Sequence, residues 1–127
     1  MLAKILVADD NDELRHQLRE YLESKHHHVL EATDGAQAFA IAEAEMPHLI
    51  IMDIVMPGLY GSTATKHIQD YWRTSKIPII IISGSVEQSV LGDLLLRPNV
   101  RYLKKPVELA VLEATIHELL PEGGYTP

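Results

Sequence analysis

Short apolar segments alternate five times with longer segments of helical periodicity along this chain. The apolar segments are too short for helices and rich in aliphatic residues, so they predict strands, at 3–8, 27–32, 48–52, 77–83 and 100–104. The segments that follow them repeat apolar residues every three or four positions and predict helices, at 12–24, 34–45, 62–72, 86–96 and 107–120. Candidate N-caps stand at the start of three of these helices: Asn11 or Asp12, Asp34, and Ser62 or Thr63.

Strict alternation of strands and helices predicts an α/β fold. Helical crossovers join parallel strands, and they leave helices on both faces of one sheet. The strands are apolar almost throughout, which is typical of a sheet covered on both sides. The chain has no internal repeat, and we expect one domain over residues 1–121. Residues 122–127, with two glycines and a proline, are expected to be a tail or the start of a linker.

Polar residues stand where four of the five predicted strands end. Asp9 and Asp10 follow the first, Asp53 the third, Ser83 closes the fourth, and Lys105 follows the fifth. The carboxyl ends of parallel strands meet at one edge of an open sheet, which is where ligands bind. Three carboxylates there would repel one another without a counter-charge, and oxygen ligands suit a hard cation, Mg²⁺ or Mn²⁺. With the hydroxyl and the ammonium group, they predict a divalent-metal and phosphoryl site.

Composition narrows the classes of function. The 127 residues carry a formal net charge of -7 with scattered basic residues, which argues against a direct nucleic-acid surface. The chain has no cysteine, so a disulfide framework and thiolate chemistry are excluded. No apolar stretch approaches the roughly 20 residues that span a bilayer, and the first ten residues lack a signal-peptide layout. We therefore expect a cytoplasmic protein that does not bind membranes.

These motifs, in this order, resemble the receiver domain of two-component response regulators. The resemblance covers residues 3 to about 120 and rests on the acidic pair, on Asp53 leading into Met56-Pro57-Gly58, on Ser83-Gly84, and on Lys105-Pro106 preceded by Tyr102. It implies a flavodoxin-like, doubly wound five-stranded parallel sheet of order 2-1-3-4-5 with five helices. It also implies a role as the phosphoacceptor module of a two-component phosphorelay.

The resemblance further implies a role for each site residue. Asp53 would accept the phosphoryl group from a partner histidine kinase or histidine phosphotransfer protein. Asp10, Asp53 and the backbone carbonyl of Val55 would bind the metal directly, and Asp9 mainly through a water. Ser83, Gly84 and Lys105 would contact the phosphoryl group, and Tyr102 would act as the switch aromatic. The Lys105–Pro106 bond is expected to be cis.

The resemblance also implies an output surface. Phosphorylation would change the surface formed by the fourth helix, the fifth strand and the fifth helix, residues 86–120. The module would be no enzyme, although it would assist its own phosphorylation and dephosphorylation. The kinase and the output domain or effector are not specified by the sequence. Departures from the family pattern at Tyr60, at Val107 and in the segment 97–100 leave the receiver subclass open.

Other functions account for less of the pattern. A phosphohydrolase with an aspartate nucleophile needs a second aspartate two residues later, where this chain has Val55. A flavin carrier of the same topology needs a hydroxyl-rich phosphate loop after the first strand, where this chain is acidic. A receiver-like module that binds partners unphosphorylated would not require the complete site. His26, His27 and His28 suggest metal ligands, but a solvent-exposed loop and strand start explain them as well.

Overall fold

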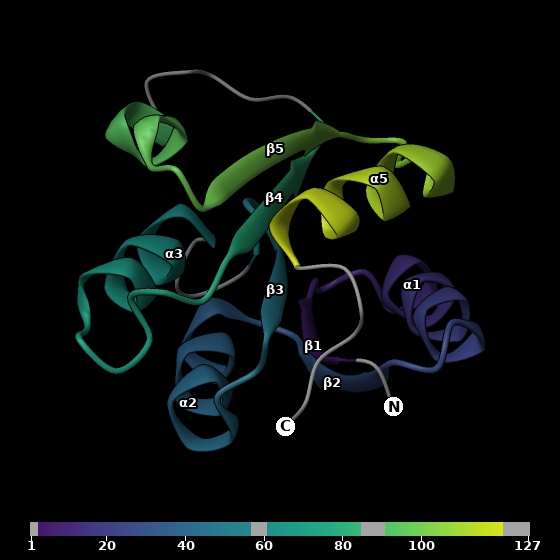
Figure 1. The fold of residues 1–127 in the computed structure, drawn as a ribbon, viewed down its shortest axis with the longest axis horizontal. Coiled ribbons are helices and arrows are strands. Elements are labelled where there is room, and N and C mark those ends of the chain that lie inside the picture. The colour runs from purple at the N-terminus through teal and green to yellow at the C-terminus, as the bar shows by residue number, and fades with distance from the viewer. Residues whose placement is uncertain (1–2, 57–60, 85–90, 121–127) are drawn as a thin grey trace.

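The protein is a doubly wound α/β sandwich, described here from a computed structural model (Figure 1). The structure describes residues 3–56, 61–84 and 91–120. Five parallel strands form one sheet in the order β2-β1-β3-β4-β5, which is the predicted order. The strands are β1 (Lys4–Ala8), β2 (His28–Ala32), β3 (Leu49–Asp53), β4 (Ile79–Ser83) and β5 (Val100–Lys104).

Helices cover both faces of this sheet. The α-helices are α1 (Asp12–Ser24), α2 (Gly35–Glu45), α3 (Gly61–Asp70) and α5 (Leu109–Leu119). In Figure 1, α1 and α5 lie on one side of the sheet, and α2 and α3 lie on the other. Parallel strands need such crossovers, because the chain must return to the opposite end of the sheet before each new strand.

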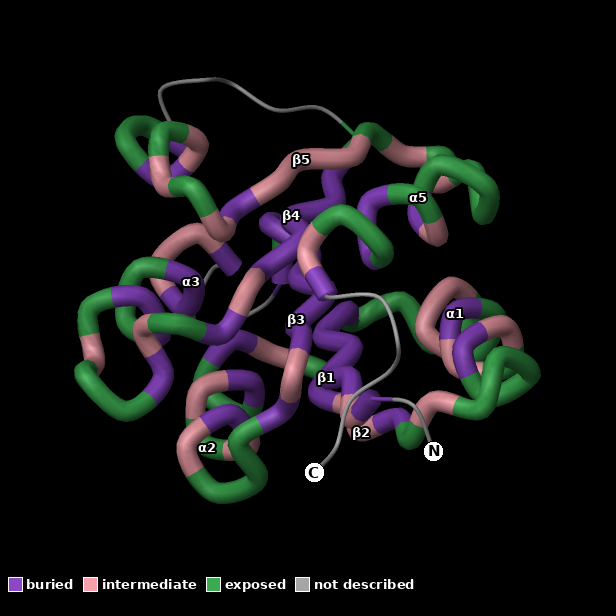
Figure 2. The backbone as a smooth tube through the Cα atoms, in the orientation of Figure 1, coloured by how far each residue is buried: buried purple, intermediate pink, exposed green. Residues whose placement is uncertain are grey.

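Each face of the sheet has its own hydrophobic core. Side chains alternate along a strand, so Leu6 and Ile50 pack toward α2 and α3, whereas their neighbours Ile5 and Ile51 pack toward α1 and α5. All five residues of β3 and of β4 are buried, and Figure 2 shows this central region in purple between greener helices. The buried strands β3 and β4 therefore fix the position of the carboxyl edge of the sheet, where Asp53 and Ser83 end them.

The predicted segments agree with the structure to within a few residues. The Asn11 side chain accepts a hydrogen bond from the Leu14 N–H at 3.0 Å, and Asp34 accepts one from the Gln37 N–H at 2.8 Å, so both predicted caps are confirmed. Helix α3 instead begins at Gly61, ahead of the predicted caps Ser62 and Thr63.

The end of the fourth helix differs from the prediction. A helix was expected over 86–96; residues 85–90 lie outside the described residues, Leu91 is helical, and Gly92–Leu96 forms a short 3₁₀-helix, η1. Gly92 has a positive φ of 48°, a conformation that does not continue an α-helix. Several predicted features lie outside the described residues: Pro57, Gly58, Tyr60, the first part of the fourth helix and the tail 122–127.

None of the helices within the described ranges combines the length and the hydrophobicity that crossing a lipid bilayer requires.

Candidate functional site

Three carboxylates meet at the carboxyl edge of the sheet. Asp9 and Asp10 follow β1, and Asp53 is the last residue of the neighbouring strand β3. One carboxylate oxygen from each lies within 4.8 Å of the others, and this is the one such group among the residues the structure describes. Asp9 and Asp53 are buried, whereas Asp10 is exposed. The group is therefore anchored in the fold and open to solvent on one side.

Lys105, the residue after the edge strand β5, supplies a positive charge. Its Nζ lies 3.2 Å from Asp9 Oδ2 and 3.4 Å from Asp53 Oδ1, so one ammonium group pairs with both buried carboxylates. Its backbone N–H donates to the Ser83 carbonyl at 2.8 Å, and the Lys105–Pro106 bond is cis, as predicted. The adjacent Lys104 is exposed, as the alternation of side chains along a strand requires.

The single positive charge of Lys105 does not neutralise the negative charges of the three carboxylates. Burial raises the pKa of the Asp53 carboxyl above its ordinary value, and the neighbouring Asp9 carboxylate raises it further. Lys105 and the Ile54 N–H lower the Asp53 pKa, but by less. Ionised Asp53 is thus disfavoured in the absence of further positive charge, and a divalent cation is the kind of ligand that would supply it.

An open cleft of about 670 Å³ leads to these groups. It is lined by Asp10, Asn11, Asp53, Val55, Ser83, Gly84 and Lys105. Val55 is 62% exposed at its rim, and Ser83 is buried at the end of β4. A side chain added at Gly84 would meet no atom within 4 Å, so the cleft has free space on that side. The cleft has room for a small anionic group beside Asp53.

Comparison with known proteins identifies the family. Residues 5–117 match the response regulator receiver domain. The chain belongs to this family. Protein PilH of Pseudomonas aeruginosa is 38% identical over 122 residues, which cover 94% of this chain and 98% of PilH. Response regulator PleD of Caulobacter vibrioides is 30% identical over 119 residues, but the receiver spans only 26% of PleD against 94% of this chain.

Solved structures agree on the fold. Chemotaxis protein CheY4 of Vibrio cholerae superimposes with a TM-score of 0.84 at 24% identity, covering 94% of this chain and 100% of that one. The receiver domain of a sensor histidine kinase from Pseudomonas aeruginosa, solved with a magnesium ion coordinated in its active site cleft, is 29% identical. Its TM-score is 0.81, with 94% of this chain and 98% of that chain covered.

The receiver brings all of the predicted site residues to one edge of the sheet, apart from Tyr102. Tyr102 is half-buried on β5, and its hydroxyl donates to the Ser83 carbonyl at 3.4 Å. The three consecutive histidines lie at the opposite end of β2, where His28 is its first residue, and they form no metal-binding group in the described ranges.

Two residues near the site were missed by the sequence analysis. Gly61 begins α3 directly against β3, so that a Cβ there would lie 1.7 Å from the Asp53 carbonyl oxygen. Arg15 on α1 donates from Nη1 to the Asp9 carbonyl oxygen at 2.9 Å. An arginine in the first turn of an amphipathic helix is ordinary, so the sequence carried no signal for this contact.

Proposed function

We propose that this receiver is a phosphoacceptor that takes a phosphoryl group from a partner phosphohistidine onto Asp53, with Mg²⁺ bound. The observation that carries the proposal is the cluster of three carboxylates within 4.8 Å, two of them paired with Lys105 at a cleft wide enough for a phosphoryl group. A single structural salt bridge requires neither the third carboxylate nor the cleft.

The donor set fits magnesium. Asp10 and Asp53, with the backbone carbonyl of Val55, would hold the ion directly, and Mn²⁺ has the same preference for oxygen ligands. Asp9 is fully buried, and its side chain already accepts from the Asn11 N–H at 2.8 Å and from Lys105, so it would act through a water. The kinase receiver solved with magnesium in its cleft supports the same choice of metal. When bound, the cation would neutralise the carboxylates and the incoming phosphoryl oxygens.

The remaining chemistry belongs to side chains of the chain. A carboxylate oxygen of Asp53 attacks phosphorus, the new O–P bond forms, and the P–N bond to the donor imidazole breaks. Lys105 then exchanges its contact with Asp53 for one with a phosphoryl oxygen, and the Ser83 hydroxyl donates to another. Gly84 leaves the approach to Asp53 open. By the same contacts, the receiver would assist both the gain and the loss of its phosphoryl group while acting as a signalling module.

The donor would be a histidine kinase or a histidine phosphotransfer protein. A groove between α1 and the start of α5 supports docking of such a protein, because its lining includes Leu14, whose N–H donates to Asn11, and Val107, two residues after Lys105. It is lined by Leu14, Gln17, Leu18, Glu20, Tyr21, Val107 and Leu109. We place the exchange in the cytoplasm. The output domain or effector is proposed to read the surface that includes η1, β5 and α5.

Intact-mass spectrometry tests the acceptor. After incubation with acetyl phosphate and Mg²⁺, the receiver should gain the mass of one phosphoryl group, and EDTA should abolish the gain. Asp53→Asn should gain nothing. Asp34→Asn is the matched control, because Asp34 caps α2 and is not a member of the carboxylate group, and this variant should be phosphorylated like the parent. Equal phosphorylation of Asp53→Asn and the parent would refute the assignment.

A further inference from the structure

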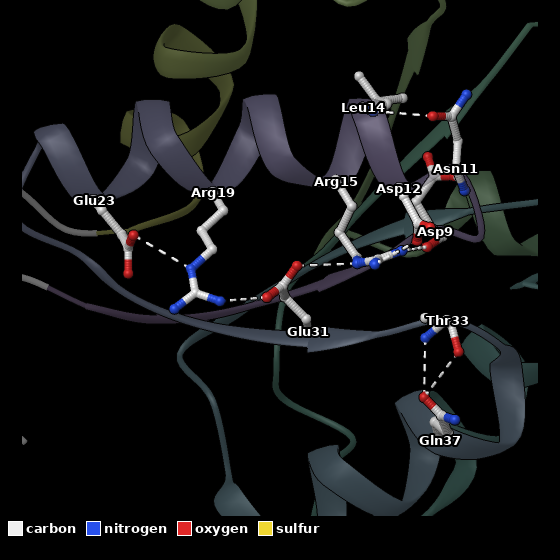
Figure 3. Close-up of polar contacts among 10 residues, drawn as sticks. All are labelled: Asp9, Asn11, Asp12, Leu14, Arg15, Arg19, Glu23, Glu31, Thr33 and Gln37. Carbon is white, nitrogen blue, oxygen red and sulfur yellow. Dashed lines mark hydrogen bonds and ion pairs between the residues drawn. The ribbon is translucent and has the colours of Figure 1, made fainter.

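Arg15 connects the acidic loop to the rest of the fold. Its guanidinium group has three acceptors: the Asp9 carbonyl oxygen at 2.9 Å, Glu31 Oε1 at 3.0 Å and Asp12 Oδ1 at 2.6 Å (Figure 3). The side chain is only 12% exposed, and its contacts with Asp9 and Glu31 are partly buried, whereas the contact with Asp12 is exposed to solvent. A planar fork of donors makes all three at once, which the point charge of a lysine cannot do.

The carbonyl that Arg15 holds belongs to the peptide between Asp9 and Asp10. The N–H of Asp9 donates to the Ala32 carbonyl at 3.1 Å. The Asp9 carboxylate accepts from the Asn11 N–H and from Lys105 Nζ. A peptide group is planar, so fixing this carbonyl also fixes the direction of the Asp10 N–Cα bond. The exposed Asp10 side chain depends on that direction to point toward Asp53.

Glu31 in turn holds Arg15. Glu31 lies on β2, paired in register with Val7 of β1, and accepts from both Arg15 and Arg19. Arg19 also pairs with Glu23 at 3.3 Å, so the ionic chain runs along α1 and ends at the acidic loop (Figure 3). β2 thereby supports a site to which it contributes no ligand.

We propose that Arg15 is a positioning residue for the metal site: it fixes the Asp9–Asp10 peptide so that Asp10 presents its carboxylate to the cation, and Glu31 keeps Arg15 in place. This inference rests on the proposed magnesium site. It assigns Arg15 no contact with the metal or the phosphoryl group.

An electrostatic role and a positioning role for Arg15 predict opposite changes in Mg²⁺ affinity when Arg15 is removed. A cation beside the acidic cluster repels Mg²⁺, so a purely electrostatic Arg15 would lower the metal affinity, and removing it would tighten binding. A positioning Arg15 raises the affinity, and removing it weakens binding. Contacts that orient metal ligands typically change metal affinity by about 10- to 100-fold.

Isothermal titration of the whole chain with MgCl₂ measures this difference. Arg15→Gln, which loses the charge, and Arg15→Lys, which keeps it, should both raise the Mg²⁺ dissociation constant about tenfold. Arg19→Gln is the matched control, since it removes the same charge from the same helix without touching the Asp9 carbonyl. It should bind Mg²⁺ within about twofold of the parent. Melting in EDTA shows whether each variant is folded at the titration temperature.

A second pair of variants covers the case in which the Arg15 variants do not fold. Glu31→Gln should weaken Mg²⁺ binding several-fold, whereas Glu23→Gln, at the far end of the same chain of ion pairs, should not. Where both fold, Glu31→Gln should add little to Arg15→Lys, because the two act through one contact. Parent-like or tighter binding by a folded Arg15→Gln overturns the inference, as does parent-like binding by Glu31→Gln. A parent that binds no Mg²⁺ overturns the proposed function as well.

Discussion

At the scale of single residues, the fold holds the Asp53 carboxylate at a cost in stability. It is 4% exposed and lies beside a second buried carboxylate, with one ammonium group shared between them. Its folded pKa is therefore raised, so its ionised form destabilises the native state. A bound cation would relieve the repulsion between the Asp9 and Asp53 carboxylates.

Asp53→Asn should consequently stabilise the metal-free receiver. In EDTA at pH 7 we expect a higher melting temperature than the parent, by about 4 °C for each kcal/mol of relief. A raised folded pKa means that Asp53 destabilises only where it is ionised. The advantage of the variant should therefore shrink as pH falls toward the ordinary aspartate value of 3.8. Calorimetry across this range checks the prediction.

Adding Mg²⁺ should reverse the order of the two melting temperatures. The parent has the complete carboxylate set and should gain more melting temperature from MgCl₂ than Asp53→Asn does. Asp34→Asn, which keeps a side-chain oxygen to cap α2, is the control and should melt close to the parent in both conditions. A lower melting temperature for Asp53→Asn than for the parent in EDTA would contradict the account of charge repulsion.

At the scale of elements, the junction of β3 and α3 sets the position of Asp53. Gly61 opens α3, and its N–H donates to the Ile54 carbonyl at 2.9 Å, so the start of the helix abuts the end of the strand. A Cβ at position 61 would clash with backbone atoms of Asp53, which cannot rotate away as a flexible side chain could. Only glycine fits here, because it has no Cβ.

Gly61→Ala should therefore move the strand end or the helix. Overpacking costs about 1–3 kcal/mol, more than the roughly 1 kcal/mol that alanine gains over glycine within a helix. We expect lower stability in urea denaturation and slower phosphorylation by acetyl phosphate. Gly84→Ala is the matched control for stability, since its Cβ meets open space, and it should unfold within about 0.5 kcal/mol of the parent. Equal stability of the parent and Gly61→Ala would refute the steric argument.

At the scale of the whole molecule, the site and the proposed output surface are joined through β4 and β5. The two strands are paired from Ile79 with Val100 to Ser83 with Lys104, and Tyr102 reaches back to the Ser83 carbonyl. A shift at Ser83 would thus alter the space around Tyr102, which packs on the α2–α3 side of the core. Such coupling needs a change in population between two arrangements and no refolding.

Beryllofluoride with Mg²⁺, a phosphoryl mimic, should shift backbone amide resonances mainly within residues 83–107. Tyr102→Leu should reduce the shifts beyond the cleft. Tyr71→Leu is the control, because Tyr71 packs against Phe39 of α2 and should leave the response unchanged. Shifts confined to the residues that line the cleft would mean that no switch operates in this chain.

The sequence by itself determined the class of fold and most of the site. Short apolar runs alternating with helical periods allow little other than a parallel sheet between helices, since crossovers between parallel strands are helical and of one hand. The strand ends then had to bring Asp9, Asp53, Ser83 and Lys105 to one edge. These are consequences of local pattern and of general rules of chain topology, so they could be predicted without coordinates.

The tertiary structure alone decided the contacts that depend on which atoms from distant segments meet. It showed that Lys105 is shared between Asp9 and Asp53, that Arg15 is held by Glu31 of β2, and that Gly61 leaves no room for a Cβ beside Asp53. It also replaced the end of an expected helix with a 3₁₀ turn at Gly92. Periodicity reports which face of an element is apolar, whereas these contacts depend on register and on the direction of individual side chains, which only the packed chain specifies.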